Sequence, residues 1–576
     1  MKRNLCALLG LLVPTLLLAA CEPKRSVDLV LRDVKVIDVE SGAVVSGQVV
    51  VVDQGVIEAV LPDTREGQFE AAQMVDADGS FLIPALGDAH VHLQYPSELE
   101  NYRRHGVGLV VNMSGGPTHL ALRDDVRQGR RDGPRIVTVG PTLDGPRPTN
   151  PLFTSVTPET APEIVGWMAE QGYDAVKVYQ QMDAETLRSV IDAARDKGMI
   201  TTGHVSRESG IEGALEAGLR YVAHGEELAF EAFEEEPRRF DRSQIPTLAA
   251  RLAERGVTVT PMIRYLQDVP PQVLALDSFL AQDAFAALPA GMKLSFGARQ
   301  GWFANRESPD AFAAQMEDAA EFVSDLTAAL RDRGVPLILG TDAGFGGALP
   351  GYGVHLELRS LVAAGLSELE ALQTATLNLG RYLQEIGAAE PPWGRIESGF
   401  SADLLLLRDN PLENIAATES IAGVALAGRW ISEQGLVEIE QNLRNRQELL
   451  LPFATAFEDA LLEGDVRAAR EAVAGIPEEV AGEPLISPDN CIFLGYRYYY
   501  RGQRDLAGQL YDLCAEMYPR SAPLWWHIGQ AREDGGNRDG AIAAYAKALE
   551  SNPWYQDPEE AIARLEKAPE GAEPDP

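Results

Sequence analysis

The residues best suited to metal chemistry are histidines and one acid that come at the ends of short apolar stretches. They are His90 and His92 in FLIPALGDAHVHL, His204 in MITTGHV, His224 in RYVAHG and Asp342 in PLILGTDAG. Imidazole and carboxylate groups are common protein ligands of Zn²⁺. Residues i and i+2 of a strand point to the same side, so His90 and His92 can face one ion. One such histidine alone would be interpreted as a core residue. Five side chains that all come at the ends of apolar stretches predict a metal site.

Lys177 is a sixth candidate, and it lies between two valines in YDAVKVYQQ. A buried ammonium group is costly unless it is paired or loses its charge. One interpretation is a lysine whose amine extends to the rim of the fold. The other is a carbamylated lysine, formed when CO₂ adds to the neutral amine, whose two carboxylate oxygens bridge two divalent ions.

Buried strands that alternate with amphipathic helices must position these side chains. Candidate strands begin near Phe81, Gly108, Arg135, Asp174, Met199, Arg220, Val257 and Pro336, and the clearest helix spans 184–197. Eight strand–helix units predict a (β/α)₈ TIM barrel, whose active sites lie at the C-terminal ends of the strands. A doubly wound α/β fold is the alternative, but no glycine-rich phosphate loop follows the first strand.

Short strands flank the barrel region on both sides. Residues 27–61 alternate apolar and polar side chains, and GRIESGFSADLLLL and IAGVALAGRWIS follow the barrel. Chain ends often meet in folded domains, so the two blocks are expected to pair in one small β-sandwich. The expected domains are a signal peptide (1–20), the two sandwich parts (21–80 and 391–435), the barrel (81–390) and a helical domain (436–576).

The helical domain contains an internal repeat whose spacing resembles tetratricopeptide repeats, which have a period of about 34 residues. The second copy has Trp525, Ile528, Gly529, Gly536, Ala541, Tyr545, Ala548 and Pro553, and the first has Cys491, Leu494, Gly495, Gly502, Ala507, Tyr511, Cys514 and Pro519. The segment is expected either to bind a partner protein or to support the barrel. Cys491 and Cys514 would lie side by side in an antiparallel helix pair, which predicts a disulfide; two buried free thiols are the alternative.

Charge and the N-terminus limit where the protein acts. Acidic residues number 86 and basic residues 50, and the formal charge of −36 repels nucleic acid. Basic residues at 2–3 and an uncharged run to residue 20 predict a signal peptide. Leu-Ala-Ala before Cys21 resembles the lipobox of bacterial lipoproteins, which implies a lipid anchor at Cys21. Glu22 by the same resemblance implies an outer membrane location facing the periplasm of the cell envelope. An ordinary signal peptide is the alternative.

The complete motif set resembles the amidohydrolase superfamily, with His-x-His on strand one, Lys on four, His on five and six, and Asp on eight. DAVKVY, GHV, AHG, GTDAG and HLELRSLVAAGLSELEALQTATLNLGRYL are similar to the branch of imidazolonepropionase-like hydrolases and Xaa-Pro or Xaa-Arg dipeptidases. The resemblance spans roughly residues 27–435 and excludes the repeat segment. The chain departs from the family at Ala85, where glycine is usual, and at VVNMSGG, which replaces Arg-Asp after strand two.

The resemblance implies two divalent ions, for which the ligand types favour Zn²⁺. One ion would be held by His90, His92 and Asp342, and the other by His204 and His224, with carbamylated Lys177 as the bridge. It further implies that a metal-bridged hydroxide attacks the amide of a dipeptide or N-acyl amino acid, while Asp342 transfers the proton.

Other candidate residues and one other function stay open at this stage. His355 is a candidate to support a ligand or to contact substrate, with a surface role as the alternative. Arg207 and Arg264 are candidates to bind a substrate carboxylate. The alternative function is an outer-membrane lipoprotein scaffold, in which the repeats bind partners and the barrel is vestigial.

Overall fold

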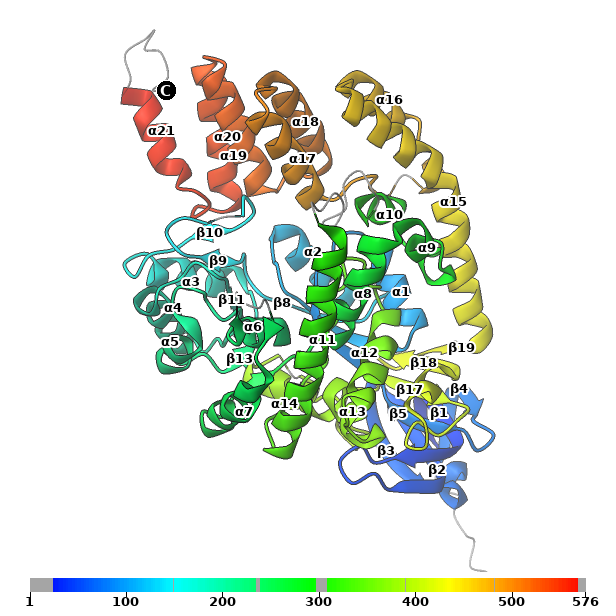
Figure 1. Cartoon of the computed structure of the whole chain (residues 1–576). Coiled ribbons are helices and arrows are strands. Elements are labelled where there is room, and N and C mark those ends of the chain that lie inside the picture. Colours follow the sequence, from blue (N-terminus) through cyan, green and yellow to red (C-terminus); the bar gives the residue numbers. More distant parts are fainter. Residues whose placement is uncertain are drawn as a thin grey trace, which may run out of the picture.

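A computed structural model describes residues 24–567, apart from 149, 235–238, 297–307, 389 and 481. The predicted signal peptide and Cys21 lie outside these residues. The described chain is a mixed α/β protein with an additional helical region at its C-terminus (Figure 1).

The two flanking blocks of short strands pair with each other as the sequence predicted, but their described residues form one continuous sheet where a β-sandwich was expected. The strands are β1 (Arg25–Ile37), β2 (Val44–Asp53), β3 (Val56–Pro62), β4 (Phe69–Asp76), β5 (Phe81–Pro84), β17 (Leu404–Leu407), β18 (Ile421–Leu426) and β19 (Arg429–Ser432). They form one sheet of order β19-β18-β17-β5-β1-β2-β3, and β4 also pairs with β1. Antiparallel pairing of β5 with β17 joins segments that lie on opposite sides of the predicted barrel region in the chain.

Parallel strands form the second part of the fold. They are β6 (Leu86–Val91), β7 (Val107–Asn112), β8 (Arg135–Thr138), β9 (Leu143–Asp144), β10 (Thr154–Ser155), β11 (Val176–Val178), β12 (Thr201–Gly203), β13 (Tyr221–Val222) and β16 (Thr258–Val259). One sheet has the order β6-β7-β8, and the other β10-β9-β11-β12-β13-β16. Isolated parallel bridges join Val139 to Ala175, Val259 to Leu337, and Val91 to Ala343.

The apolar stretch that begins at Phe81 contributes one strand to the flanking sheet and another to the sheet β6-β7-β8, although the sequence predicted a single strand. Residues 81–84 form β5 in the flanking sheet, and residues 86–91 form β6 beside β7. Between them, the Ala85 amide donates to the Asp403 carbonyl and the Leu86 amide to the Gly106 carbonyl, both at 2.9 Å. The stretch is long enough to pair with two different partners in succession, because an extended residue rises about 3.3 Å.

Helices cover the parallel strands on the outside. They include α1 (Glu98–Arg104), α2 (Pro117–Arg127), α3 (Ala161–Gln171), α4 (Ala184–Asp196), α5 (Gly210–Ala217), α6 (Gly225–Phe230), α7 (Ile245–Glu254), α8 (Ile263–Leu274), α9 (Leu276–Leu280), α10 (Ala290–Phe296), α11 (Pro309–Asp332), α12 (Tyr352–Ala363), α13 (Glu368–Ala375) and α14 (Leu377–Glu385). The helix expected over 184–197 is α4, which ends one residue earlier. The Asp183 side chain caps it by accepting from the Thr186 amide, and Leu187, Val190 and Ala194 form its buried face.

The C-terminal region consists of helices only. They are α15 (Glu433–Glu463), α16 (Val466–Ala474), α17 (Pro488–Tyr500), α18 (Arg504–Met517), α19 (Ala522–Asp534), α20 (Arg538–Ser551) and α21 (Pro558–Lys567). In Figure 1, α15 runs along one side of the molecule, and α17–α21 lie across its upper end near β9 and β10.

Both central helix pairs of this region pack in the same way. The starts of α17 and α19 are separated by the same length of chain as the starts of α18 and α20. A Cβ atom on Gly495 would lie 2.2 Å from the Tyr511 ring, and one on Gly529 would lie 2.3 Å from the Tyr545 ring. Glycine is therefore required at both positions, because only its small size lets the tyrosine of the partner helix approach so closely.

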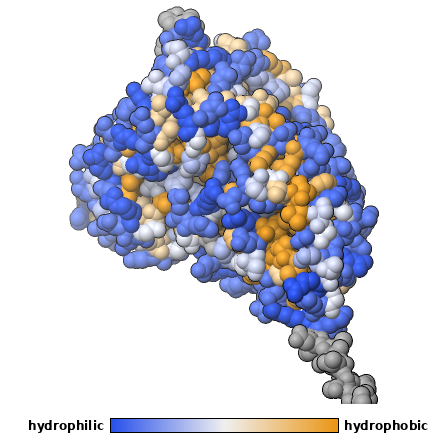
Figure 2. All heavy atoms as spheres, turned by 90° about the horizontal axis from the view of Figure 1, so that it is seen from below, coloured by the Kyte–Doolittle hydropathy of each residue, from blue (hydrophilic) through white to orange (hydrophobic). Residues whose placement is uncertain are grey.

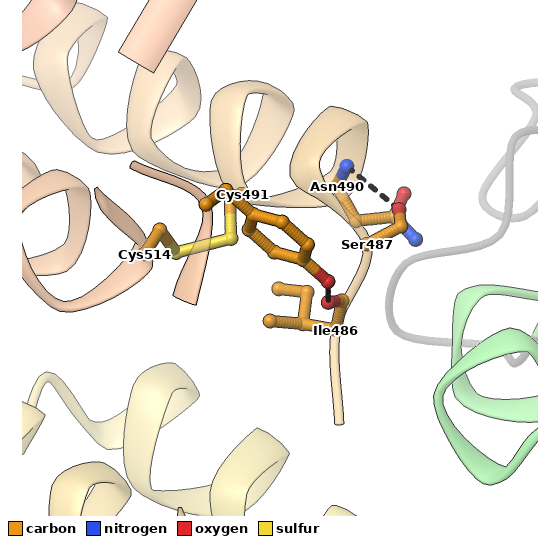
Figure 3. The surroundings of a disulfide bond; sticks show 6 residues. Ile486, Ser487, Asn490, Cys491 and Cys514 are labelled. Atoms are coloured by element: carbon orange, nitrogen blue, oxygen red, sulfur yellow. Dashed lines mark hydrogen bonds between the residues drawn. A yellow bond between two sulfur atoms is a disulfide. The ribbon is translucent and has the colours of Figure 1, made fainter. Parts of the chain in front are cut away.

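The predicted disulfide between Cys491 and Cys514 is confirmed (Figure 3). Their Cα atoms are 6.3 Å apart, within the range that a disulfide requires. The bond joins α17 to α18 across a sequence separation of 23 residues, which corresponds to about 3 kcal/mol in the chain-entropy model.

The surface seen from below is mostly hydrophilic, with a long strip of hydrophobic residues and smaller hydrophobic areas beside it (Figure 2). A hydrophilic exterior agrees with the excess of acidic residues in the sequence. None of the helices in the described ranges has the length and apolar composition that crossing a bilayer demands.

Candidate metal centre

The structure brings all six predicted metal-binding residues together. His90 lies in β6 and Lys177 in β11, while His92, His204, His224 and Asp342 follow β6, β12, β13 and the Leu337 segment. Single atoms of His90, His224 and Asp342 lie within 4.8 Å of one another. The ring centroid of His224 is 4.6 Å from that of His90 and 4.4 Å from that of His204. Parallel strands produce this arrangement, because their C-terminal ends open on one side.

The four imidazoles are suited to hold metal ions. Burial lowers the pKa of His90, His92, His204 and His224, so that their rings are neutral and keep a free lone pair. Neither nitrogen of His224 has a hydrogen-bond partner, and the Nδ1 atoms of His90 and His92 have none. Buried polar atoms are rarely left unpaired in proteins. The residues therefore fit a bound divalent cation, which would satisfy several of these nitrogens.

Asp342 supplies the negative charge of the cluster. Its Oδ1 atom lies 3.1 Å from His92 Nε2 and 3.4 Å from His90 Nε2. Burial alone would raise the pKa of Asp342, but the close contact with the His92 imidazole lowers it well below its usual value. Asp342 has a φ of +58°, a strained conformation that is often found at functional sites. Its carboxylate is thus ionised and held in place, as a metal ligand requires.

Lys177 lies inside the cluster and does not extend to the rim. Its side chain is buried, and Nζ lies 3.2 Å from His90 Nε2. Burial lowers the pKa of Lys177 to about 8, so a sizeable fraction of the amine is neutral at physiological pH. The interpretation as a lysine that extends to the rim is therefore wrong.

The sequence analysis did not identify two residues that contact His204, namely Glu227 and Gln180. The Nδ1 atom of His204 lies 2.5 Å from Glu227 Oε1, and Gln180 Nε2 donates to the same oxygen at 2.6 Å. Despite burial, His204 holds the pKa of Glu227 below its usual value. A carboxylate on one imidazole nitrogen orients the ring and leaves the other nitrogen free for a metal. Glu227 is the second acid of AHGEE, the motif that contains His224, and this pair of acids could have indicated it.

Asp88 was also missed, and it connects the first strand to the Asp342 segment. Its Oδ1 atom accepts from the amides of His90 and Thr341, both at 3.1 Å. Its Oδ2 atom accepts from the Thr341 hydroxyl at 2.6 Å. Asp88 is fully buried, and burial raises its pKa to about 7. It positions the backbone on both sides of the cluster without contacting the cavity.

The cluster opens into a cavity of about 170 Å³, which suits a small molecule. The lining residues come from β11, from segments that follow the parallel strands, and from α6, α8 and α17: His92, Ser114, Thr142, Asn150, Leu152, Phe153, Lys177, Tyr179, His204, His224, Glu226, Tyr265, Asp342, Phe345, Asp489 and Phe493. Ser114 lies in VVNMSGG, the segment that departs from the family pattern, so this departure does reach the cavity.

The other sequence candidates lie away from this cavity. His355 is buried, its Nδ1 is 2.9 Å from Thr418 Oγ1, and its Nε2 is 3.0 Å from the His105 carbonyl oxygen. It therefore joins α12 to neighbouring segments and has neither a substrate contact nor a surface position. Arg264 pairs with Asp268 at 2.5 Å, and Arg207 is exposed beside the Phe230 ring. Neither arginine is among the described residues that line the cavity.

The fold and the residues of this cluster could hold a metal centre, and comparison with known families shows the class of protein. The amidohydrolase family profile matches residues 81–431, more than half of the chain. The chain belongs to the amidohydrolase family, whose members are hydrolases that act on amide bonds. The predicted resemblance to the amidohydrolase superfamily is thereby confirmed, and the matched residues include all six candidate ligands.

Individual relatives are distant in sequence. An uncharacterized protein of Mycobacterium tuberculosis is 24% identical over 380 residues, which cover 61% of this chain and 85% of the relative. A Xaa-Pro dipeptidase structure with bound methionine in its active site has a TM-score of 0.52 and 21% identity, covering 70% of this chain and 99% of that one. Aspergillus niger ochratoxinase has a TM-score of 0.52 and 18% identity, with 71% and 96% covered. At such identities the structures establish the fold.

Proposed function

We propose that this protein is a binuclear metal-dependent amidohydrolase that cleaves dipeptides or N-acyl amino acids. The observation that carries the proposal is the convergence of four neutral imidazoles, an ionised aspartate and a buried lysine at one cavity. The fold shared with a Xaa-Pro dipeptidase supports a peptide-like substrate.

The proposed ligand sets follow the positions of the side chains. His90, His92 and Asp342 would hold one ion, and His204 and His224 the other. Lys177 would be the shared ligand as a carbamate, and the position of its amine beside His90 supports this role. Imidazole and carboxylate ligands favour Zn²⁺. When bound, two such ions supply a nucleophile from water near neutral pH and polarise the substrate carbonyl.

The residues of the chain would then control protons and orientation. The ionised Asp342 carboxylate can accept a proton from water and deliver it to the leaving nitrogen. Glu227 keeps the His204 ring in one orientation, and Asp88 holds the backbone of His90 and Thr341. The side chains are thus preorganised, which lowers the cost of reaching the transition state.

We also infer that the parallel strands close into a TIM barrel and that the C-terminal helices are tetratricopeptide-like. The bridges at Val139, Val259 and Val91 support closure, because they link the two sheets and the Leu337 segment in chain order. The equal spacing of the helix starts and the Gly–Tyr contact in both helix pairs support the repeat.

The amidohydrolase proposal predicts both metal binding and turnover. Protein prepared with bicarbonate and reconstituted with Zn²⁺ should contain about two ions per chain, as elemental mass spectrometry measures. It should hydrolyse members of a library of dipeptides and N-acyl amino acids, with amine release as the readout. Fully loaded protein that cleaves no amide in the library would contradict the proposal and favour the scaffold with a vestigial barrel.

We further propose that Cys21 anchors the mature protein in the outer membrane. Replacing Cys21 with alanine should release the protein from the membrane fraction or leave its signal peptide uncut, because the acylated thiol is missing. Mass spectrometry of the wild-type N-terminal peptide should show the lipid. A wild-type protein that fractionates with the cytoplasm and retains Met1 would contradict this proposal.

A further inference from the structure

Helix α17 of the C-terminal region contributes directly to the cavity of the metal centre. Asp489 and Phe493 line the cavity together with His204, His224 and Asp342. They are four residues apart on a helix, so they lie on the same face. Both lie beyond residue 431, where the match to the amidohydrolase family ends. This chain has therefore added a wall of its own to the family site.

The first turn of α17 is held firmly in place. Ser487 caps the helix by accepting from the Asn490 amide at 3.2 Å, and the Cys491–Cys514 bond ties it to α18 (Figure 3). Tyr518 donates to the Ile486 carbonyl oxygen at 2.6 Å. A side chain on such a rigid element keeps a defined position, as selective binding demands.

The same helical region supports a second part of the cavity wall. Asn150, Leu152 and Phe153 line the cavity in the loop before β10. The Gln556 side chain donates to the Phe153 carbonyl oxygen at 3.4 Å, and Tyr555 donates to the carbonyl oxygen of Pro151. The C-terminal helices thus shape the cavity from two sides, which favours the supporting role over a purely partner-binding one.

The chemistry of the cavity wall is acidic and aromatic. Glu226, Asp342 and Asp489 line it, and Lys177 is the one cationic side chain among the described lining residues. Aromatic rings complete the wall at Phe153, Tyr179, Tyr265, Phe345 and Phe493. Carboxylates and aromatic faces both attract cations, so this wall favours a positively charged group on the substrate.

Asp489 differs from the other acids of the cavity wall because no cationic side chain among the described residues pairs with its carboxylate. Its side chain is partly buried at the cavity, and burial raises its pKa to about 6. Asp342, in contrast, lies against imidazoles. At neutral pH Asp489 is still mostly ionised. A cationic group in the cavity would compensate for the hydration that this carboxylate loses on burial.

We propose that Asp489 is a specificity-determining residue, which binds an ammonium or guanidinium group of the substrate inside the cavity that α17 completes. The proposal rests on the amidohydrolase function proposed above and names its substrate class: amides that carry a positive charge close to the scissile bond. Phe493 would cover the apolar part of the same substrate.

Matched pairs of substrates that differ by one charge test this assignment. The pairs are lysine against norleucine at either position of a glycine dipeptide, arginine against citrulline, and the free dipeptide against its N-acetyl form. Wild-type enzyme loaded with Zn²⁺ should prefer the cationic member of at least one pair by about 10- to 100-fold in kcat/KM. The Asp489→Asn variant should lose most of that ratio, because the amide keeps the shape of the carboxylate and removes its charge.

Asp505→Asn is the matched control. Asp505 is exposed and is the second residue of α18, just as Asp489 is the second residue of α17, so both changes remove the same helix-terminal charge. The control should keep the wild-type ratio. A wild-type enzyme without preference for cationic members, or a preference that survives Asp489→Asn, would overturn the assignment.

A binding measurement separates this proposal from the proposed hydrolysis. Calorimetric titration of the Zn²⁺-loaded protein with arginine, citrulline, lysine and norleucine needs no turnover. Tighter binding of the cationic amino acids that Asp489→Asn abolishes would support Asp489 even if no amide were cleaved. Equal binding of charged and neutral members by an enzyme that does cleave amides would overturn the role of Asp489 alone.

Discussion

Replacing Lys177 with alanine should remove most of the bound metal and reduce kcat by about 10³-fold or more. The side chain is buried against His90 with its amine 3.2 Å from the imidazole nitrogen. If it carries the bridging carbamate, alanine removes both oxygens that two ions would share, and the imidazoles alone must bear two dications. Elemental analysis and single-turnover kinetics measure the two losses on the same preparation.

Two comparisons isolate the carbamate from the general cost of altering a buried lysine. Lys293→Ala changes another partly buried lysine, whose amine donates to the Ala286 carbonyl oxygen outside the site. This variant should keep its metal and its kcat. Added acetate or propionate should restore part of the activity of Lys177→Ala, because a small carboxylate fits the vacated space and supplies two oxygens. A Lys177→Ala protein with full metal and full activity would refute the bridge.

The second large effect is expected for Asp342→Asn, which should lower kcat by about 10²- to 10⁴-fold. Asparagine keeps the shape of the side chain but cannot accept a proton from water. It also loses the negative charge that faces His90 and His92. Because the pKa of Asp342 is held far below neutrality, the wild-type carboxylate is ionised throughout the working range of pH, so the loss should be the same at pH 6 and pH 8.

Metal content distinguishes the two roles of Asp342. Loss of one ion together with activity identifies ligation as the main contribution, whereas retained metal with slow turnover identifies proton transfer. Asp505→Asn, a surface aspartate of the helical region, serves as the charge control and should be indistinguishable from wild type. Turnover of Asp342→Asn at the wild-type rate would exclude both roles.

The candidate metal ligands could be predicted from the sequence because each depends on a short local pattern. His90 and His92 share one side of a strand by the two-residue period, and His204 and His224 follow the short buried strands β12 and β13. Once the strands are parallel, their C-terminal ends open on the same side, so residues distant in sequence are gathered without any further signal. The Cys491–Cys514 bond was predictable for a similar reason, since both cysteines belong to one helix pair.

The remaining features depend on contacts between elements that are far apart in the chain, and no local sequence pattern encodes such contacts. The division of the Phe81 stretch between two sheets depends on pairing with β17, which follows the whole set of parallel strands in the chain. His355 follows the eighth candidate strand and was expected to be free for a ligand or a substrate. In the structure, Thr418 and the His105 carbonyl contact both of its nitrogens. Asp489 reads as an ordinary acid in the first turn of a helix until α17 docks against the metal centre and turns it toward the cavity. Periodicity and steric preference act over a few neighbouring residues, so the sequence by itself determined the strands, the candidate ligands and the helix pairs. Which surfaces meet depends on the complementarity of whole layers, so only the tertiary structure decided what else lines the site.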